Sequence, residues 1–271
     1  MQQSMSMSEI QQVALSVLKQ VAQVCEQQGF RYTLAFGTLI GAVRHQGFIP
    51  WDDDIDLLMP RPDYERLLAY LAENPLPNLK VMNLRTNPKV FFGLTRICDG
   101  RYRVIEDQFY DYGLGIFIDI YPVDGLADDI EEAKARYPYA FNLGDIALDI
   151  VRKDVKVWRP ALPFKARIHR CLRFLNYHLH GNRFYLNKLE AYARSRRFED
   201  YRYVGNINWS WRQLCFDRQW FDDCIKVPFE DASFYIVRNY DEMLRQQYGD
   251  YMQLPPVEER VYHHFYSAYR K

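Results

Sequence analysis

The apolar positions near the N-terminus repeat at helical spacing. Ser8 and Gln11 resemble a capping box at the start of this segment, and Gly29 is a typical C-terminal stop. The pattern predicts an amphipathic helix over residues 8–28 that packs against the core. The residues on its apolar face are Ile10, Val13, Ala14, Val17, Leu18, Val21 and Cys25.

Alternating or short apolar runs follow this helix and predict a sheet. Gly37 and Thr38 predict a turn after the first run, and a short helix follows from Leu39 to His45. Pro60 and Pro62 begin a further helix whose apolar face includes Tyr64 and Leu71. Strands are predicted at residues 31–36, 51–59, 79–84, 90–98, 102–106 and 115–121.

From Asp128 onward the pattern becomes mainly helical, with a Pro-containing turn at Val227 and a helix expected over residues 236–248. The sequence therefore predicts an α+β fold, a mixed sheet flanked by helices with a mainly helical C-terminal half. We expect a catalytic core over residues 1–127 and a basic, aromatic region over 128–271, whose C-terminal segment returns to the cleft.

Charge is distributed unevenly along a chain whose formal net charge is zero. Zero net charge gives no general attraction to nucleic acid, so none is expected as a partner. Residues 156–197, however, contain eleven Lys and Arg and one acid, Glu190. Within this segment an apolar stripe from Ile168 to Leu179 either faces the core below a solvated basic face or lies on an anionic membrane or substrate.

The five cysteines are scattered without metal-ligand spacing, which favours a reducing compartment. The sequence shows neither a signal-peptide pattern nor a long uncharged apolar run. We therefore expect a cytoplasmic protein with at most peripheral contact at the inner face of the cell membrane.

An acidic cluster provides the strongest chemical signal. Asp52, Asp53, Asp54 and Asp56 occupy four of five consecutive positions. Asp54 and Asp56 flank one apolar residue, so strand alternation directs both carboxylates to the same side. Their repulsion calls for a proton, a cation or a metal ion.

A later strand supplies a third carboxylate. Asp119 is the single charge in GIFIDIY, where an unpaired carboxylate is costly. Three carboxylates suit Mg2+ or Mn2+ bound to phosphates, and the turn at Gly37 and Thr38 offers N–H groups to a phosphate. This is the layout of a nucleotidyltransferase-like sheet. The same aspartates are also compatible with an acidic surface turn, or with a glycosyltransferase D-x-D on a sugar nucleotide.

A longer match adds to this evidence. The run FGTLIGAVRHQGFIPWDDDIDLLMPRPDYERL resembles the signature of the LicD family of phosphotransferases, which is similar to the fukutin group. Weaker likeness continues through GIFIDIYPVDG and FEDASFYIVRNYDEMLRQQYGDYMQLPP. The resemblance implies a nucleotidyltransferase-like fold and transfer of a phospho-group, typically phosphocholine from CDP-choline, onto a cell-surface glycan built on a lipid carrier.

Carried over onto this chain, the resemblance makes Asp54 and Asp56 the metal ligands, with Asp119 as the third and a possible base. Alternatives are a D-x-D glycosyltransferase, a nucleotidyltransferase, or a non-catalytic membrane-attached assembly protein in glycan synthesis.

Residues around the acidic cluster receive supporting roles. Gly37 and Thr38, together with Arg44, His45 and Arg96, are candidate contacts for the donor phosphates. We expect Asp52 and Asp53 to be outer residues and Asp124 to form a turn. Tyr248, Asp250, Pro255 and Pro256 are expected to close the cleft. A choline group requires an aromatic cage, for which the candidates are Trp51, Trp209, Trp211 and Tyr112.

Overall fold

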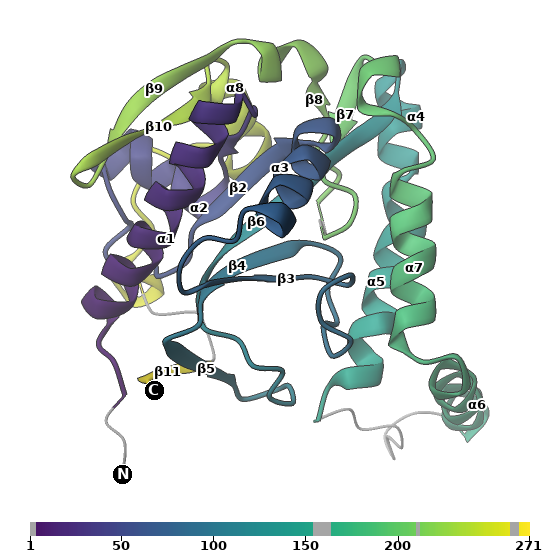
Figure 1. Ribbon diagram of the computed structural model, residues 1–271. Coiled ribbons are helices and arrows are strands. Elements are labelled where there is room, and N and C mark those ends of the chain that lie inside the picture. The colour runs from purple at the N-terminus through teal and green to yellow at the C-terminus, as the bar shows by residue number, and fades with distance from the viewer. Residues whose placement is uncertain (1–3, 154–163, 210–211, 261–265) are drawn as a thin grey trace.

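The computed structural model describes residues 4–153, 164–209, 212–260 and 266–271 and has an α+β fold, as expected (Figure 1). The helices are α1 (Met7–Gln28), α2 (Phe36–Ile40), α3 (Arg61–Glu73), α4 (Ile130–Ala135), α5 (Tyr137–Val151), α6 (Phe164–His180), α7 (Asn182–Ala193) and α8 (Tyr240–Tyr248), with a π-helical turn η1 (Gly41–His45) after α2. The strands are β1 (Thr33–Leu34), β2 (Asp56–Pro60), β3 (Leu79–Met82), β4 (Thr95–Asp99), β5 (Tyr102–Glu106), β6 (Ile116–Ala127), β7 (Tyr203–Gly205), β8 (Phe216–Asp217), β9 (Cys224–Phe229), β10 (Ala232–Val237) and β11 (Tyr266–Arg270).

The central sheet has the strand order β1-β2-β6-β4-β3, and β7 and β8 extend it from the far end of β6. Strands β2 and β6 run parallel, whereas β4 is antiparallel to β6. Strand β6 is buried along its whole length, as expected for a strand covered on both faces. It therefore fixes the positions of its two neighbours, β2 and β4.

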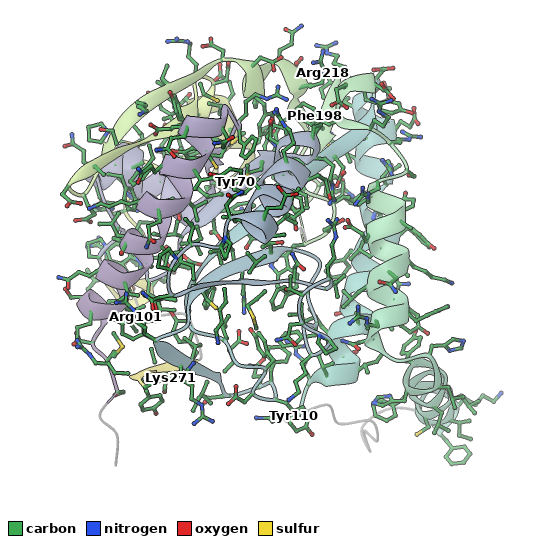
Figure 2. All side chains as sticks on the ribbon, viewed as in Figure 1. Tyr70, Arg101, Tyr110, Phe198, Arg218 and Lys271 are labelled. Carbon is green, nitrogen blue, oxygen red and sulfur yellow. The ribbon has the colours of Figure 1, made fainter. Side chains whose placement is uncertain are left out.

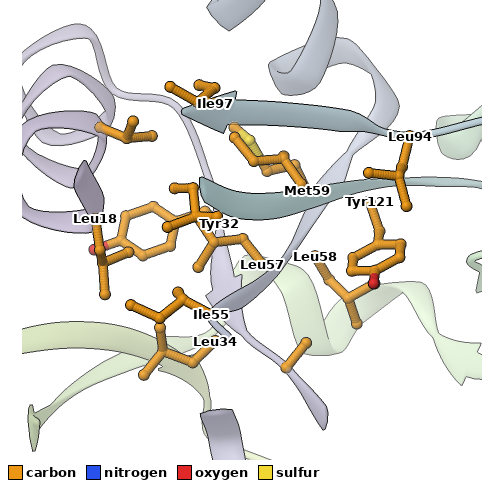
Figure 3. Close-up of a cluster of buried hydrophobic side chains, with 14 of the residues drawn as sticks. Leu18, Tyr32, Leu34, Ile55, Leu57, Leu58, Met59, Leu94, Ile97 and Tyr121 are labelled. Carbon is orange, nitrogen blue, oxygen red and sulfur yellow. The ribbon is translucent and has the colours of Figure 1, made fainter. Parts of the chain in front are cut away.

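Helix α1 covers one face of this sheet and contacts β4 and β6 (Figure 1). Its capping box is formed by Ser6 and Glu9, two residues before the expected Ser8 and Gln11, because the Glu9 carboxylate accepts a hydrogen bond from the Ser6 N–H at 2.9 Å. Gly29 ends the helix in the left-handed conformation, as predicted. Figure 3 shows Leu18 of α1 packed with Tyr32, Leu34, Ile55 and Leu57 in the core below it.

Several expected boundaries were wrong. Gly37 and Thr38 lie within α2 instead of forming a turn, and the acidic strand begins at Asp56 instead of Trp51. Val227 lies in the hairpin β9–β10, so the last helix begins at Tyr240 and not near Ile236. Strand pairing accounts for two of these differences, since β2 pairs with β1 and β9 pairs with β10.

The second half of the chain is helical but also supplies strands. Helices α5 and α7 lie side by side and bury a second apolar cluster that includes Leu143, Ile146 and Leu189 (Figure 1). Strand β11 pairs with β5, and β7 pairs with β6. The boundary expected at residue 127 stays a prediction, and strands from both sides of it are hydrogen-bonded to each other.

Helix α6 lies at a corner of the molecule, away from the sheet, and its side chains surround it there (Figures 1 and 2). Ile168, Leu172, Leu175 and Leu179 are between 42% and 84% exposed. The interpretation in which this stripe faces the core was therefore wrong.

Asp124 does not form a turn, as was expected, but lies inside β6. Arg61, at the start of α3, donates hydrogen bonds to both carboxylate oxygens of Asp124, at 2.8 and 2.6 Å. Arg61 also donates to Glu190 of α7 at 2.9 Å. Since both Arg61 and Asp124 are buried, this two-point ion pair fastens α3 and α7 to the end of the central strand.

Removing one partner of this ion pair would leave the other charge buried without its counter-charge. We expect Asp124→Ala to lower the free energy of unfolding by about 3–5 kcal/mol, and the double change Arg61→Leu, Asp124→Leu to cost less. Urea unfolding measures both. The control Glu131→Ala removes an exposed pair with Lys134 and should cost under about 1 kcal/mol. A loss for Asp124→Ala no larger than the control's would contradict this account.

Candidate active site

Three charged residues form a row across the centre of the sheet. Asp56 on β2 is the register partner of Asp119 on β6, and Asp119 is the partner of Arg96 on β4. Residues opposite one another on adjacent strands have side chains within contact distance. The strand pairing thus brings together Asp56, Arg96 and Asp119, which together span more than sixty residues of the sequence.

The Asp119 carboxylate has an ion-pair partner, because Arg96 Nε donates a hydrogen bond to Asp119 Oδ1 at 3.0 Å. Arg96 Nη1 also donates to Glu106 at 3.1 Å and to the Tyr112 hydroxyl at 2.6 Å. The Arg96 guanidinium lies between the rings of Phe92 and Phe117, 4.6 and 4.2 Å from their centroids. Its orientation is therefore fixed by ion pairs and by ring contacts.

Burial controls the ionisation of the aspartates. Burial, and then the charges of Asp54, Asp119 and Asp52, raise the pKa of Asp56 well above its usual value. Burial raises the pKa of Asp119 to about 6, although Arg96 opposes the shift. Ionisation of one carboxylate in the cluster thus disfavours ionisation of the others, as expected for carboxylates that share a site.

One oxygen of this cluster shows how a cation would fit. Asp56 Oδ1 is buried and has no hydrogen-bond partner, and a buried polar atom of this kind needs a proton or a cation. Within the described residues, no group of three or more acidic, His or Cys side chains has metal-binding geometry. Arg96 also occupies one oxygen of the third carboxylate, that of Asp119. The donor chemistry of Asp54 and Asp56 fits a hard divalent ion, and the role of Asp119 as a ligand stays a prediction.

Helix α2 holds the acidic segment in place. The Thr38 hydroxyl accepts a hydrogen bond from the Asp56 N–H at 2.9 Å and contacts the Asp54 carbonyl at 3.5 Å. A Cβ atom at position 37 would lie 2.6 Å from Asp52 Oδ2, so only glycine allows this approach. Gly37 and Thr38 therefore contact the acidic segment itself, and their contact with a donor phosphate stays a prediction.

The two other aspartates point away from the row or lie beside it. Asp53 is buried and accepts a hydrogen bond from the Tyr266 hydroxyl of β11. The Asp52 carbonyl accepts from Gln11 of α1 at 2.7 Å, and its carboxylate lies against Gly37. Their placement matches the outer positions expected for them.

Arg44 and His45 lie in η1 beside the C-terminal segment. Arg44 Nε donates to His45 Nε2 at 2.9 Å, and its Nη1 donates to the Tyr251 carbonyl at 2.6 Å. Burial, and then the charge of Arg44, lower the pKa of His45 and favour its neutral form. Burial and the charge of Arg260 lower the pKa of Arg44 itself. Repulsion between Arg44 and Arg260 suits a place for an anion.

The C-terminal helix also approaches the aspartates. Burial, and then the charge of Asp56, raise the pKa of Tyr248 at the end of α8, while Arg212 opposes the shift from above its ring. The Tyr248 side chain is 40% exposed, and its role in closing the cleft stays a prediction.

The aromatic candidates are scattered. Trp209 lines a cavity of about 280 Å³ that also includes Arg96. Trp51 instead lies 5.7 Å from Arg260, and the Tyr112 hydroxyl bonds to Arg96 and Glu106. Trp211 lies outside the described residues.

Sequence analysis missed Glu106 and the pairing of Arg61 with Asp124. Glu106 is the last residue of an ordinary-looking strand, so its sequence position carries no signal of the Arg96 contact. Arg61 does carry a signal, because a charge between two prolines at a helix start is unusual, but its partner is 63 positions away.

Comparisons with known proteins agree on one family. The model for the LicD/FKTN/FKRP nucleotidyltransferase domain matches residues 29–134, which include the whole row. The chain is 29% identical over 272 residues, 98% of each chain, to the lipopolysaccharide cholinephosphotransferase LicD of Haemophilus influenzae. It is 44% identical over 57 residues, 21% of each chain, to an uncharacterized protein of Rickettsia prowazekii, and over 41 residues (15% of this chain, 13% of the relative) to one of Rickettsia typhi.

The raised pKa values predict a pH dependence of stability. Asp56 and Asp119 hold protons more tightly when folded than when unfolded, so their contribution to stability falls as pH rises from about 4 through about 6. Asp56→Asn removes one of these charges. In EDTA, we expect its melting temperature, relative to the unchanged protein, to rise by a few degrees between pH 4.5 and pH 7. A difference that stays constant or falls over this range would contradict the assignment.

Proposed function

We propose that this chain is a LicD family enzyme and that it transfers phosphocholine, or a related phospho-alcohol, from a CDP-linked donor to a hydroxyl of a cell-surface glycan precursor. The observation that carries the proposal is the row of Asp56, Asp119 and Arg96 inside the matched domain. The full-length similarity to a lipopolysaccharide cholinephosphotransferase supports the choice of group and acceptor.

Asp54 and Asp56 are proposed to hold Mg2+ or Mn2+. The partnerless Asp56 Oδ1 and the mutual repulsion of the carboxylates support this assignment. When bound, the ion would polarise the donor phosphates and offset the negative charge that develops on them. The Thr38 hydrogen bond to the Asp56 N–H keeps the carboxylate in position.

Asp119 is proposed as the base. The acceptor oxygen attacks the phosphorus that carries choline, the bond from this phosphorus to the bridging oxygen breaks, and CMP leaves with the electron pair. The hydroxyl proton passes to the Asp119 carboxylate. A pKa of about 6 leaves Asp119 ionised at neutral pH and still able to accept this proton, while Arg96 fixes its orientation through Oδ1.

The donor phosphates are proposed to lie between α2 and the row. Gly37 and Thr38 lie in α2 and contact the acidic segment, so a phosphate bound at the aspartates would lie beside them. Arg44, with the neutral His45 beside it, is near enough to Arg260 for their charges to repel, and a phosphate would relieve that repulsion. Arg96 contributes through Asp119 and through the cavity that it lines.

A glycosyltransferase or a nucleotidyltransferase would use the same aspartates. The products separate these enzymes from the proposed one. Release of CMP from CDP-choline without pyrophosphate identifies the proposed transfer, whereas release of UDP or pyrophosphate identifies the alternatives.

The aspartates give a direct test. Asp54→Asn and Asp56→Asn should each lower CMP release from CDP-choline by about 10³-fold or more, since losing a metal ligand removes several kcal/mol of transition-state stabilisation. EDTA should have a similar effect, reversed by excess Mg2+ or Mn2+.

Asp53→Asn is the matched control, because Asp53 belongs to the same acidic run but bonds to Tyr266. It should keep activity within about tenfold of the unchanged protein. Activity within tenfold for both Asp54→Asn and Asp56→Asn would refute the proposed site.

The second part of the proposal is that the protein contacts anionic lipid at the inner face of the cell membrane. The apolar stripe of α6 is exposed, and residues 164–180 contain four Lys and Arg and no acid. None of the described helices is long and apolar enough to cross a bilayer. An amphipathic helix with basic flanks lies in the headgroup region of anionic lipid, where a lipid-linked glycan would also be found.

Vesicle sedimentation tests this surface. We expect binding to vesicles with anionic lipid that weakens with salt, and a loss of about tenfold or more for the double change Leu172→Glu, Leu175→Glu. The control Met252→Glu, Val257→Glu changes exposed apolar residues outside α6 and should bind normally. Equal binding by both double variants would exclude α6, and no binding at low salt would exclude the membrane contact.

A further inference from the structure

An aromatic cavity is lined in part by Arg96 of β4. It measures about 280 Å³ and lies among the end of β5, one side of α5 along most of its length and the segment that precedes residue 210. Four aromatic side chains line it: Phe91, Phe109, Phe141 and Trp209. The rings of Phe91 and Phe109 stack 4.2 Å apart, which gives one wall a continuous aromatic surface.

The cavity adjoins the acidic row through one side chain. Arg96 lines the cavity and also donates to Asp119 Oδ1 at 3.0 Å. A ligand that fills the cavity therefore lies one side chain away from the proposed base.

The charges around the cavity favour a cation. The Arg96 charge is already compensated by Asp119 and Glu106. Arg152, at the rim, lies 4.0 Å from Asp149. Asp145 lies one turn after Phe141 on α5, so its carboxylate and that aromatic ring belong to the same face of the helix.

We infer that this cavity binds the quaternary ammonium group of the substrate. A trimethylammonium group has no hydrogen to donate, so ring faces and a nearby carboxylate recognise it better than hydrogen-bond acceptors do. The inference rests on the proposed function for the identity of the ligand, and it assigns to that ligand four aromatic residues and Asp145. Trp209 was one of four sequence candidates, and the other three rings were not among them.

Choline and its neutral isostere 3,3-dimethylbutan-1-ol provide the test, measured by calorimetric titration of the full chain. The unchanged protein should bind choline at least about tenfold more tightly than the isostere, because only choline carries the charge. Trp209→Leu should weaken choline binding by about tenfold. Asp145→Asn should weaken choline binding and leave binding of the isostere unchanged.

The controls distinguish choline binding in this cavity from choline binding at another tryptophan and from CMP binding in the cavity. Trp51→Leu changes a tryptophan beside Arg260 and should leave choline binding unchanged. Asp145 is exposed, so its variant reports on the cavity even where Trp209→Leu does not fold. Equal affinity for choline and the isostere, or CMP binding that is lost in Trp209→Leu while choline binding is kept, would overturn the inference.

Failure of the proposed function would look different. Choline binding that depends on Trp209 and Asp145, with no CMP release from any CDP-linked donor, leaves the cavity assigned and refutes the transfer reaction. The opposite result is also informative. If CMP release depends on donor concentration in the same way in the unchanged protein and in both cavity variants, the transfer reaction stands and the cavity assignment is refuted.

Discussion

The ion pair between Asp119 and Arg96 is the constraint on which the rest of the site depends. A carboxylate at the centre of a fully buried strand requires a partner, and the antiparallel neighbour β4 supplies it at the same register position. The parallel neighbour β2 places Asp56 on the other side of Asp119, and the buried Asp56 Oδ1 has no hydrogen-bond partner among the described residues. The sheet thus provides an ion-pair partner for the Asp119 carboxylate and leaves one oxygen of the Asp56 carboxylate without a hydrogen-bond partner. This asymmetry is what makes the row a candidate site for metal-assisted chemistry.

Residues far away in sequence hold the acidic segment at this point. The Thr38 hydroxyl supports Asp56 from α2, Gln11 of α1 holds the Asp52 carbonyl, and Tyr266 of β11 holds the Asp53 carboxylate. Both ends of the chain therefore contribute to the geometry of a stretch near its beginning. Sequence similarity that spans 98% of the Haemophilus protein is consistent with a site that needs the whole chain.

The proposed work is divided among three surfaces, two beside the row and one on α6 at a corner of the molecule (Figure 1). Helix α2 and Arg44 suit phosphates, the aromatic cavity beside Arg96 suits an ammonium group, and the exposed stripe of α6 suits a lipid surface. The buried pair of Arg61 and Asp124 serves stability instead, since it fixes α3 and α7 to the far end of β6. A substrate with a charged head, a diphosphate and a lipid-linked acceptor would use all three surfaces.

The sequence by itself determined the α+β class, helix α1 and the strand identity of residues 102–106, because local periodicity is visible in one stretch. The roles that it assigns to Asp54, Asp56 and Asp119 stay predictions. The sequence misplaced the start of β2 and the role of Asp124, which depend on partners outside the stretch. Only the tertiary structure decided that Arg96 pairs with both Asp119 and Glu106, that Trp209 lines a cavity with three phenylalanines, and that the α6 stripe is exposed. The reason is physical: strand register and helix docking are set by contacts between residues distant in sequence, which a local pattern does not encode.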